Sequence, residues 1–158
     1  MQFFIRPLKT KEAPLLADFL YEAIFVSETV TPPAKDIIYL PQLQIYISHF
    51  GRLKDDYALA AEKEGRVVGV VWVRIINDFA HVDDTTPSLA VSVLPPYRGK
   101  GIGRALLTGM LELLKQKKYK QVSLSVQKQN PAVRLYKRLG FLPFRENQEE
   151  CILVRPLD

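Results

Sequence analysis

The sequence of 158 residues lacks most of the features that would commit it to a special class of protein. With one cysteine it cannot form an intramolecular disulfide, so nothing in it requires an oxidising compartment. It has no apolar run near the ~20 residues that a membrane-spanning helix needs. Its first residues lack the basic-then-apolar layout of a signal peptide. These absences predict a cytoplasmic protein that is not embedded in a membrane.

Internal repeats, low-complexity tracts and linker-like stretches are also missing. We therefore expect residues 1–158 to form one domain, which is long enough to bury a hydrophobic core without stabilising cross-links. Apolar residues make up 47% of the chain and charged residues 25%, as in ordinary globular proteins. No spacing of Cys and His residues suits zinc, so no metal site is predicted.

Much of the net charge of +5 comes from Lys115, Lys117, Lys118 and Lys120, where a helix should end and solvated cations complement its dipole. The charge is also compatible with an anionic ligand, which could be a nucleic acid or a phosphate-rich cofactor. The sequence contains no zinc-finger spacing, aromatic RNA-binding motif or clear recognition helix. A nucleic-acid-binding domain is therefore the weaker of the two interpretations, and charge alone does not decide between them.

The pattern of apolar residues predicts an α+β (mixed α/β) fold, built on one twisted and mostly antiparallel sheet. Strands are expected at 3–7, 57–62, 67–76, 88–94, 122–126, 141–145 and 151–155. A first helix should begin with Thr10 as its cap and continue to Ile24. A second helical stretch over 37–50 should be interrupted at Pro41, and further helices should span 102–117 and 131–139.

Two details of this arrangement follow from local spacing. The strand–helix–strand unit from Ser88 to Val126 should place its two strands parallel, through a crossover connection. In the second of these strands, Ser123 and Ser125 alternate with larger apolar residues and are expected to point outward.

The most informative segment runs from Val93 to Leu107, where a strand leads through a glycine-rich loop into a helix. Such a turn aims unpaired backbone N–H groups at one point, and the helix dipole adds positive potential there. Gly99, Gly101 and Gly103 would let a ligand approach the backbone closely. The cationic side chains flanking them are those of Arg98, Lys100 and Arg104. The segment therefore predicts a phosphate-binding site.

Two common phosphate loops do not fit this segment. A Walker loop requires GxxxxGK[ST], whereas Lys100 is followed by Gly101. A dinucleotide-binding fingerprint requires GxGxxG, whereas the third glycine here comes one residue early. The spacing thus argues against ATP hydrolysis and hydride transfer.

Two motifs in order carry a family resemblance. Arg98-x-x-Gly101-x-Gly103 follows Val93-x-Pro95 and precedes an amphipathic helix, and it resembles the acyl-CoA-binding motif of the GNAT N-acetyltransferases. The segment from Asn130 to Phe141 is similar to that family's Asn…Ala…LeuTyr…GlyPhe segment. The resemblance is strong from about residue 89 to residue 141. In the N-terminal half it extends to the order of the elements.

The resemblance implies an acetyl-CoA cofactor held between two splayed parallel strands. Its pantetheine arm would bond to the main chain of Val91 and Val93, and its pyrophosphate would lie on the amides from Gly99 to Arg104. The cofactor-binding residues implied are Val91, Val93, Arg98, Gly99, Lys100, Gly101, Ile102, Gly103, Arg104 and Asn130.

The resemblance also implies a catalytic residue. Tyr136 occupies the position of the family's tyrosine beside the cofactor sulfur, where it would stabilise the departing thiolate. Many members carry a glutamate near the start of the strand before the glycine loop, but Thr86-Pro87-Ser88-Leu89 has none. His81 and Asp84 are the candidates for the base.

Glu28 and Tyr39, in the helical region that caps the substrate side in this family, are weaker candidates for the base. The implied activity is transfer of an acetyl group to a primary amine of a small molecule or protein, by direct attack within a ternary complex. The missing glutamate leaves a non-catalytic acyl-CoA-binding module as the alternative. The resemblance further allows a homodimer, since dimers are common in the family.

Overall fold

The computed structural model describes residues 2–27 and 29–158. The strands are β1 (Phe4–Pro7), β2 (Tyr57–Lys63), β3 (Arg66–Arg74), β4 (Ser88–Val93), β5 (Gln121–Gln127), β6 (Leu142–Glu146) and β7 (Glu150–Pro156). The α-helices are α1 (Leu16–Ala23), α2 (Pro41–Gln44), α3 (Ile102–Gln116) and α4 (Ala132–Arg138), and 3₁₀ turns cover Thr10–Leu15, Lys35–Tyr39 and Pro95–Tyr97. None of these helices has the length and hydropathy needed to cross a bilayer.

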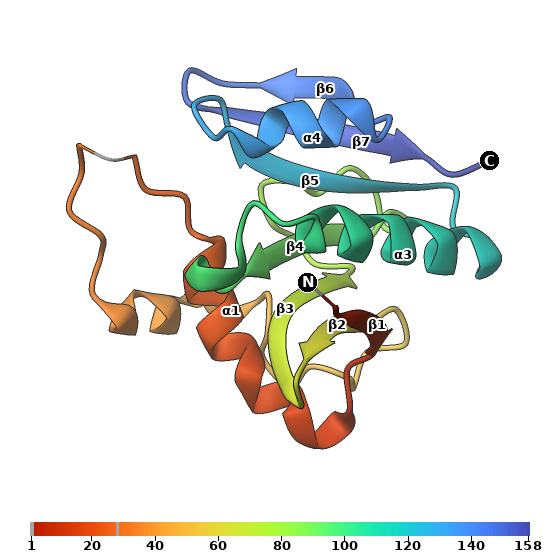
Figure 1. The fold of residues 1–158 in the computed structure, drawn as a ribbon. Helices are drawn as coiled ribbons and strands as arrows, with labels where there is room; N and C mark the ends of the chain where they lie inside the picture. The colour runs from red at the N-terminus through yellow and green to blue at the C-terminus, as the bar shows by residue number, and fades with distance from the viewer. Residues whose placement is uncertain (1, 28) are drawn as a thin grey trace.

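The seven strands form one sheet in the order β1-β2-β3-β4-β5-β7-β6. Neighbouring strands are antiparallel except for β4 and β5, which are parallel. Among the described residues, the register between these two is confined to Ser88 opposite Ser123, and the arrows diverge toward their carboxyl ends in Figure 1. The predicted α+β fold, with its splayed parallel pair, is confirmed.

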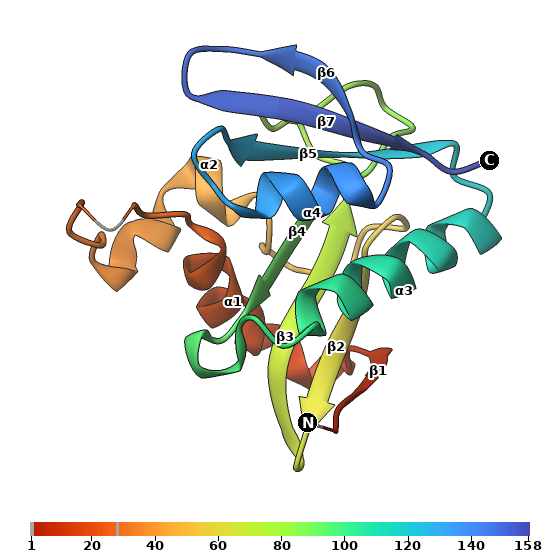
Figure 2. The same ribbon diagram turned by 45° about the horizontal axis from the view of Figure 1, so that its top comes forward.

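Helices cover both faces of the sheet, as Figure 2 shows for α3 and α4 on one of them. The apolar stripe of α3 packs with α4 and one face of the sheet into the larger buried cluster. The second cluster joins α1 and the 35–50 segment to the opposite face, around Trp72 and Val70. Each face of the central strands is therefore buried, which accounts for the continuous apolar run of β3.

Prolines account for two departures from regular helix in the N-terminal half. The first α-helix begins at Leu16 rather than at Thr10, because Pro14 has no N–H to donate and the chain before it forms a 3₁₀ turn capped by Lys9. Leu40, which precedes Pro41, is extended with ψ 139°. The predicted interruption at Pro41 is confirmed, but Thr10 as the helix cap was wrong.

The outward orientation predicted for Ser123 was also wrong. Its side chain is fully buried, and its hydroxyl donates to the carbonyl of Ala80 at 2.7 Å. The loop between β3 and β4 folds over this part of the sheet and supplies that acceptor. Spacing within a strand cannot reveal cover that comes from a distant loop.

A cluster of Arg6, Glu12 and Glu62 connects β1 to the first 3₁₀ turn and to β2. It leads to a prediction about stability in acid. Arg6 donates from both terminal nitrogens to Glu12 at 2.9 and 2.8 Å, and its Nε donates to Glu62. The hydrogen bonds from Arg6 hold the pKa of Glu12 at about 2, below its ordinary value of 4.5. Because the pKa is depressed on folding, this contribution is complete above about pH 4.5 and is lost as the pH falls toward 2.

We expect Glu12→Gln to lower the free energy of unfolding by about 1–2 kcal/mol at pH 7, after allowance for solvent screening. Urea titrations of both proteins between pH 7 and pH 2 should show this difference constant above about pH 4.5 and shrinking steadily below it. A difference that stays constant with pH would contradict the charge-based explanation.

Candidate active site

The gap between β4 and β5 leaves backbone groups of β4 unpaired. The N–H of Leu94 donates to the carbonyl of Val68 on β3 at 2.9 Å. Because backbone groups alternate along a strand, those of Val91 and Val93 point away from β3 and toward the gap. The structure thus places the main chain of both predicted partners along this edge, where the carbonyl of Val93 accepts a hydrogen bond from Arg98.

The glycine loop enters α3 in a left-handed conformation. Gly99 and Gly101 have φ values of 75° and 87°, and Gly101 is the N-cap of α3. A Cβ on either residue would meet no described atom within 4 Å, so backbone conformation rather than crowding within the chain calls for glycine. The amides of Ile102, Gly103 and Arg104 follow at the unpaired first turn of the helix.

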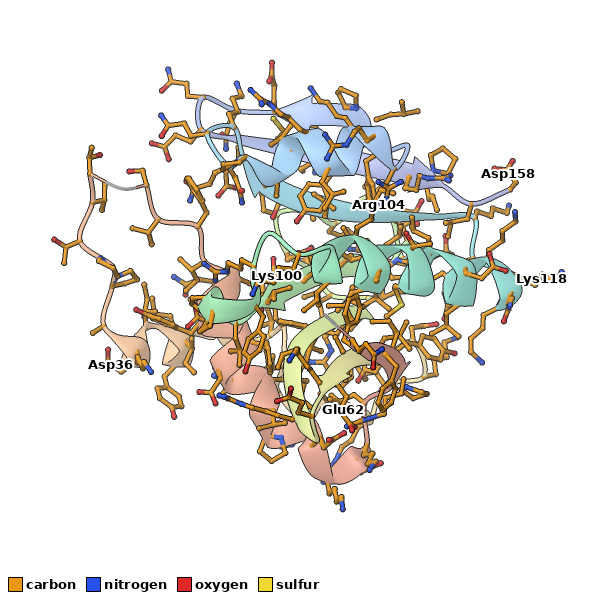
Figure 3. The ribbon with its side chains drawn as sticks, in the orientation of Figure 1. Asp36, Glu62, Lys100, Arg104, Lys118 and Asp158 are labelled. Carbon is orange, nitrogen blue, oxygen red and sulfur yellow. The ribbon has the colours of Figure 1, made fainter. Side chains whose placement is uncertain are left out.

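The cations around this loop have different roles. Arg98 folds back, donating from Nε to the carbonyl of Val93 at 2.8 Å and from Nη2 to Glu22 at 3.1 Å. It therefore fixes the loop against β4 and α1, while its charge is partly neutralised by Glu22. Lys100 and Arg104 lie at the loop end of α3, where Figure 3 labels both.

Two cavities adjoin at the gap. One, of about 690 Å³, extends over the glycine loop and the start of α3 and is called here the glycine-loop cavity. The other, of about 720 Å³, extends toward α2 and β7 and is called the acidic cavity, after Asp78 and Glu150 in its lining. The residues common to both linings are Ala23, Ile24, Phe25, Val91, Asn130 and Tyr136.

Tyr136 stands where the cavities adjoin. Its side chain is 9% exposed and packs edge-on against Phe141, with ring centroids 5.8 Å apart. Burial raises the pKa of its hydroxyl to about 12. No hydrogen bond joins this hydroxyl to any residue in the described ranges, so it is available to a ligand.

Local chemistry explains why α4 presents Tyr136 at this point. The Asn130 carboxamide oxygen accepts the N–H of Ala132 at 2.9 Å and satisfies one donor at the start of the helix. Gly140 ends the segment with φ 96°, and a Cβ there would lie 2.7 Å from Nε of Arg155. The Asn and Gly of the sequence motif therefore fix both ends of the segment that carries the tyrosine.

The acidic cavity contains a polar group that sequence reasoning missed. Asp78 accepts the Tyr46 hydroxyl at 2.6 Å and the Ser88 hydroxyl at 2.9 Å. Burial, together with the negative charge of Asp78, raises the pKa of Tyr46. Glu150 begins β7, opposite Gln127 of β5. The adjacency of β5 and β7 is what brings Glu150 to the cavity, and no local motif signals it.

The predicted bases lie elsewhere. Nδ1 of His81 is 2.9 Å from the carbonyl oxygen of Ile76, and its Nε2 is 3.3 Å from Asp84. The side chain of Asp84 is 97% exposed, and neither residue lines either cavity. Tyr39 is 71% exposed and also outside both linings. Glu28 lies outside the described residues.

Comparison with known proteins identifies the family. The model of the acetyltransferase (GNAT) family matches residues 20–141, which include the glycine loop and Tyr136. The chain belongs to the GNAT acetyltransferase family. The sequence resemblance is thereby confirmed, and the match extends well into the N-terminal half, where the sequence motifs were weak.

This GNAT chain is similar to two relatives of known name and to a solved structure. A Bacillus subtilis (strain 168) protein, named as a ribosomal protein bS18-alanine N-acetyltransferase, is 29% identical over 145 residues, covering 87% of this chain and 86% of its own. An N-alpha-acetyltransferase of Sulfurisphaera tokodaii is 35% identical over 113 residues, covering 65% and 67%. PaiA N-acetyltransferase from Thermoplasma acidophilum, solved with coenzyme A, superposes with TM-score 0.72 at 21% identity, covering 99% of each chain.

Metal ligation has no support in the part of the chain that the structure describes. No three His, Cys, Asp or Glu side chains gather there in a way that could hold a metal ion.

Proposed function

We propose that this GNAT protein transfers the acetyl group of acetyl-CoA to a primary amine, by direct attack while both substrates are bound. The observation that carries the proposal is the meeting of two cavities at Tyr136. One cavity offers backbone amides and cations and the other offers carboxylates, so the two ends of the site suit different substrates.

The residues present fit acetyl-CoA. The edge of β4 at Val91, and the N–H of Val93, can pair with the amide-bearing pantetheine arm, as a strand edge pairs with a peptide. The amides from Gly99 to Arg104 at the N-terminus of α3 suit the pyrophosphate. Arg104 and Arg138 line the same cavity and add positive charge. Asn130 uses its oxygen to cap α4, which leaves its NH₂ group as a donor.

The side chain to which we assign a role in the chemical step is Tyr136, through its hydroxyl. In this step the neutral amine nitrogen would attack the thioester carbonyl, an N–C bond would form as the C–S bond breaks, and the proton lost by the nitrogen would pass to solvent. Tyr136 donates a hydrogen bond to the departing sulfur. Its pKa of about 12, against ~8.5 for a thiol, makes complete proton transfer to the thiolate uphill. Tyr136 thus acts as a hydrogen-bond donor, and the thiolate takes its proton from solvent.

We also propose an α-amino group at a protein or peptide N-terminus as the acceptor. The similarity to two proteins named for acetylation of such amines supports it. Chemistry supports it too, because an α-amine has pKa ~7.7–8.0 and a lysine amine ~10.4, so far more of the former is neutral at pH 7. An α-amine therefore needs a catalytic base less than a lysine amine does.

Three further predictions accompany this function. A sheet that continues through all seven strands supports one domain over residues 1–158. The unpaired, half-buried Cys151 is compatible with a reducing cytoplasm. A homodimer stays a prediction.

The test is a panel of amines incubated with acetyl-CoA, with free thiol measured over time. Peptides with a free N-terminus should release thiol fastest, and the same peptides with a blocked N-terminus and a lysine should be much slower. Coenzyme A binding without thiol release from any amine would instead favour the non-catalytic acyl-CoA-binding module.

A further inference from the structure

The charge of the site is divided sharply between its two cavities. The glycine-loop cavity is lined by Arg98, Arg104 and Arg138 against one carboxylate, that of Glu22. Among the described residues, the acidic cavity is lined by Asp78 and Glu150 and by no Lys, Arg or His. This is unexpected in a chain with a net charge of +5. The acidic cavity therefore attracts cations and repels anions.

The two carboxylates of the acidic cavity are not equivalent. Both oxygens of Asp78 already accept hydrogen bonds, from the hydroxyls of Tyr46 and Ser88. No described residue donates to the carboxylate of Glu150 or forms an ion pair with it. Asp78 is thus held by the protein, while Glu150 is available to a ligand.

The rest of the acidic cavity is largely apolar. Phe25, Ile24, Leu43 and Phe79 contribute to its walls, and Tyr136 lines it with a hydroxyl that has no partner among the described residues. Charges interact more strongly across a space with apolar walls than across bulk solvent. A second carboxylate in this cavity would meet Glu150 and Asp78 with no cation to balance it.

We propose that Glu150 binds the ammonium group of the acceptor, which loses a proton to solvent before the nitrogen attacks, and that the acidic cavity excludes amines carrying a carboxylate on the adjacent carbon. The acceptor class is then a cationic amine whose neighbouring group is uncharged, as at the first residue of a peptide. Free α-amino acids are excluded. This inference rests on the proposed function, since it assigns the acceptor to the cavity opposite the glycine loop.

The experiment compares L-alaninamide with L-alanine, which differ in the charge next to the amine. Affinity is measured by calorimetry on protein saturated with coenzyme A, and transfer by thiol release from acetyl-CoA. Both measurements are made on wild type, Glu150→Gln and Glu149→Gln. Glu149 is exposed and outside both linings, so its replacement is a matched control for the loss of one carboxylate.

We expect wild type to bind alaninamide at least about 100-fold more tightly than alanine, and Glu150→Gln to reduce that ratio at least about tenfold. Glu149→Gln should leave the ratio unchanged. The amine pKa of each ligand is common to all three proteins, so a changed ratio isolates the carboxylate.

Equal affinity for alaninamide in wild type and Glu150→Gln would overturn the inference, even if acetyl transfer proceeds. A ratio reduced equally by both variants would also overturn it, because general electrostatics would then suffice. Conversely, binding that depends on Glu150 in a protein that releases no thiol would uphold the inference and refute the proposed function.

Discussion

Replacing Tyr136 by phenylalanine should lower kcat by about 30- to 1,000-fold, with affinity for coenzyme A nearly unchanged. The substitution removes one hydroxyl and keeps the ring against Phe141, so the packing of α4 is retained. The hydroxyl donates a hydrogen bond to the departing sulfur, whose negative charge develops only as the C–S bond breaks. Its loss therefore falls on the transition state and not on binding of the ground state.

The measurement is steady-state thiol release with the best acceptor from the amine panel, beside calorimetric titration with coenzyme A. Tyr39→Phe is the control, because this tyrosine is exposed and lines neither cavity. It should behave as wild type. Unchanged kcat in Tyr136→Phe, with pre-steady-state data showing that product release does not mask chemistry, would reduce Tyr136 to a packing residue.

Replacing Gly103 by aspartate should weaken coenzyme A binding by about 100-fold or more while the fold is preserved. Gly103 is the second residue of α3, and a Cβ there would lie 4.0 Å from Cγ2 of Val93, an ordinary contact. An acidic residue in the first turn of a helix is favourable to the helix dipole. The same carboxylate would lie beside the backbone amides that are assigned to the phosphates of coenzyme A. Its negative charge would repel those phosphates and weaken binding.

Melting temperature with and without saturating coenzyme A separates the two effects. Gly103→Asp should melt no lower than wild type without ligand and should lose the ligand-induced increase. Gly103→Ala is the control for the added Cβ: it should keep stability, since alanine suits a helix better than glycine, and should weaken coenzyme A binding far less than Gly103→Asp does. Affinity of Gly103→Asp within about threefold of wild type would show that the phosphates lie elsewhere.

Gly101 is less suited to this test, although it is the more prominent glycine of the motif. Its φ of 87° disfavours any other residue, so a substitution would strain the loop as well as repel the ligand. The sequence motif does not distinguish a glycine needed for conformation from one needed for access. The φ angles of the folded chain make this distinction, since Gly101 has a positive φ and Gly103 lies within α3.

Much of the fold was predictable because local signals and burial agree. The turn between β2 and β3 has positive φ at both Glu64 and Gly65, as expected for a tight hairpin. The glycines around α3 and α4 mark where those helices begin and end, and the motif placed Tyr136 correctly on α4. These features depend on residues close together in the chain.

What could not be predicted depends on contacts between distant segments. The engagement of Arg98 with Glu22 requires α1 to lie beside the glycine loop. The position of Glu150 requires β7 to insert between β5 and β6. His81 and Asp84 were chosen because they precede β4 in the sequence, yet neither residue lines either cavity. Sequence distance was a poor guide to these juxtapositions.

The most direct measurement counts both products of one reaction. A peptide with a free N-terminus is incubated with acetyl-CoA and the protein, and the released thiol and the acetylated peptide are quantified at several times. We predict equal amounts of the two at every time, with the acetyl group on the N-terminal amine. Thiol release without acetylated peptide, or neither product while coenzyme A binds, would contradict acetyl transfer between the two cavities at Tyr136.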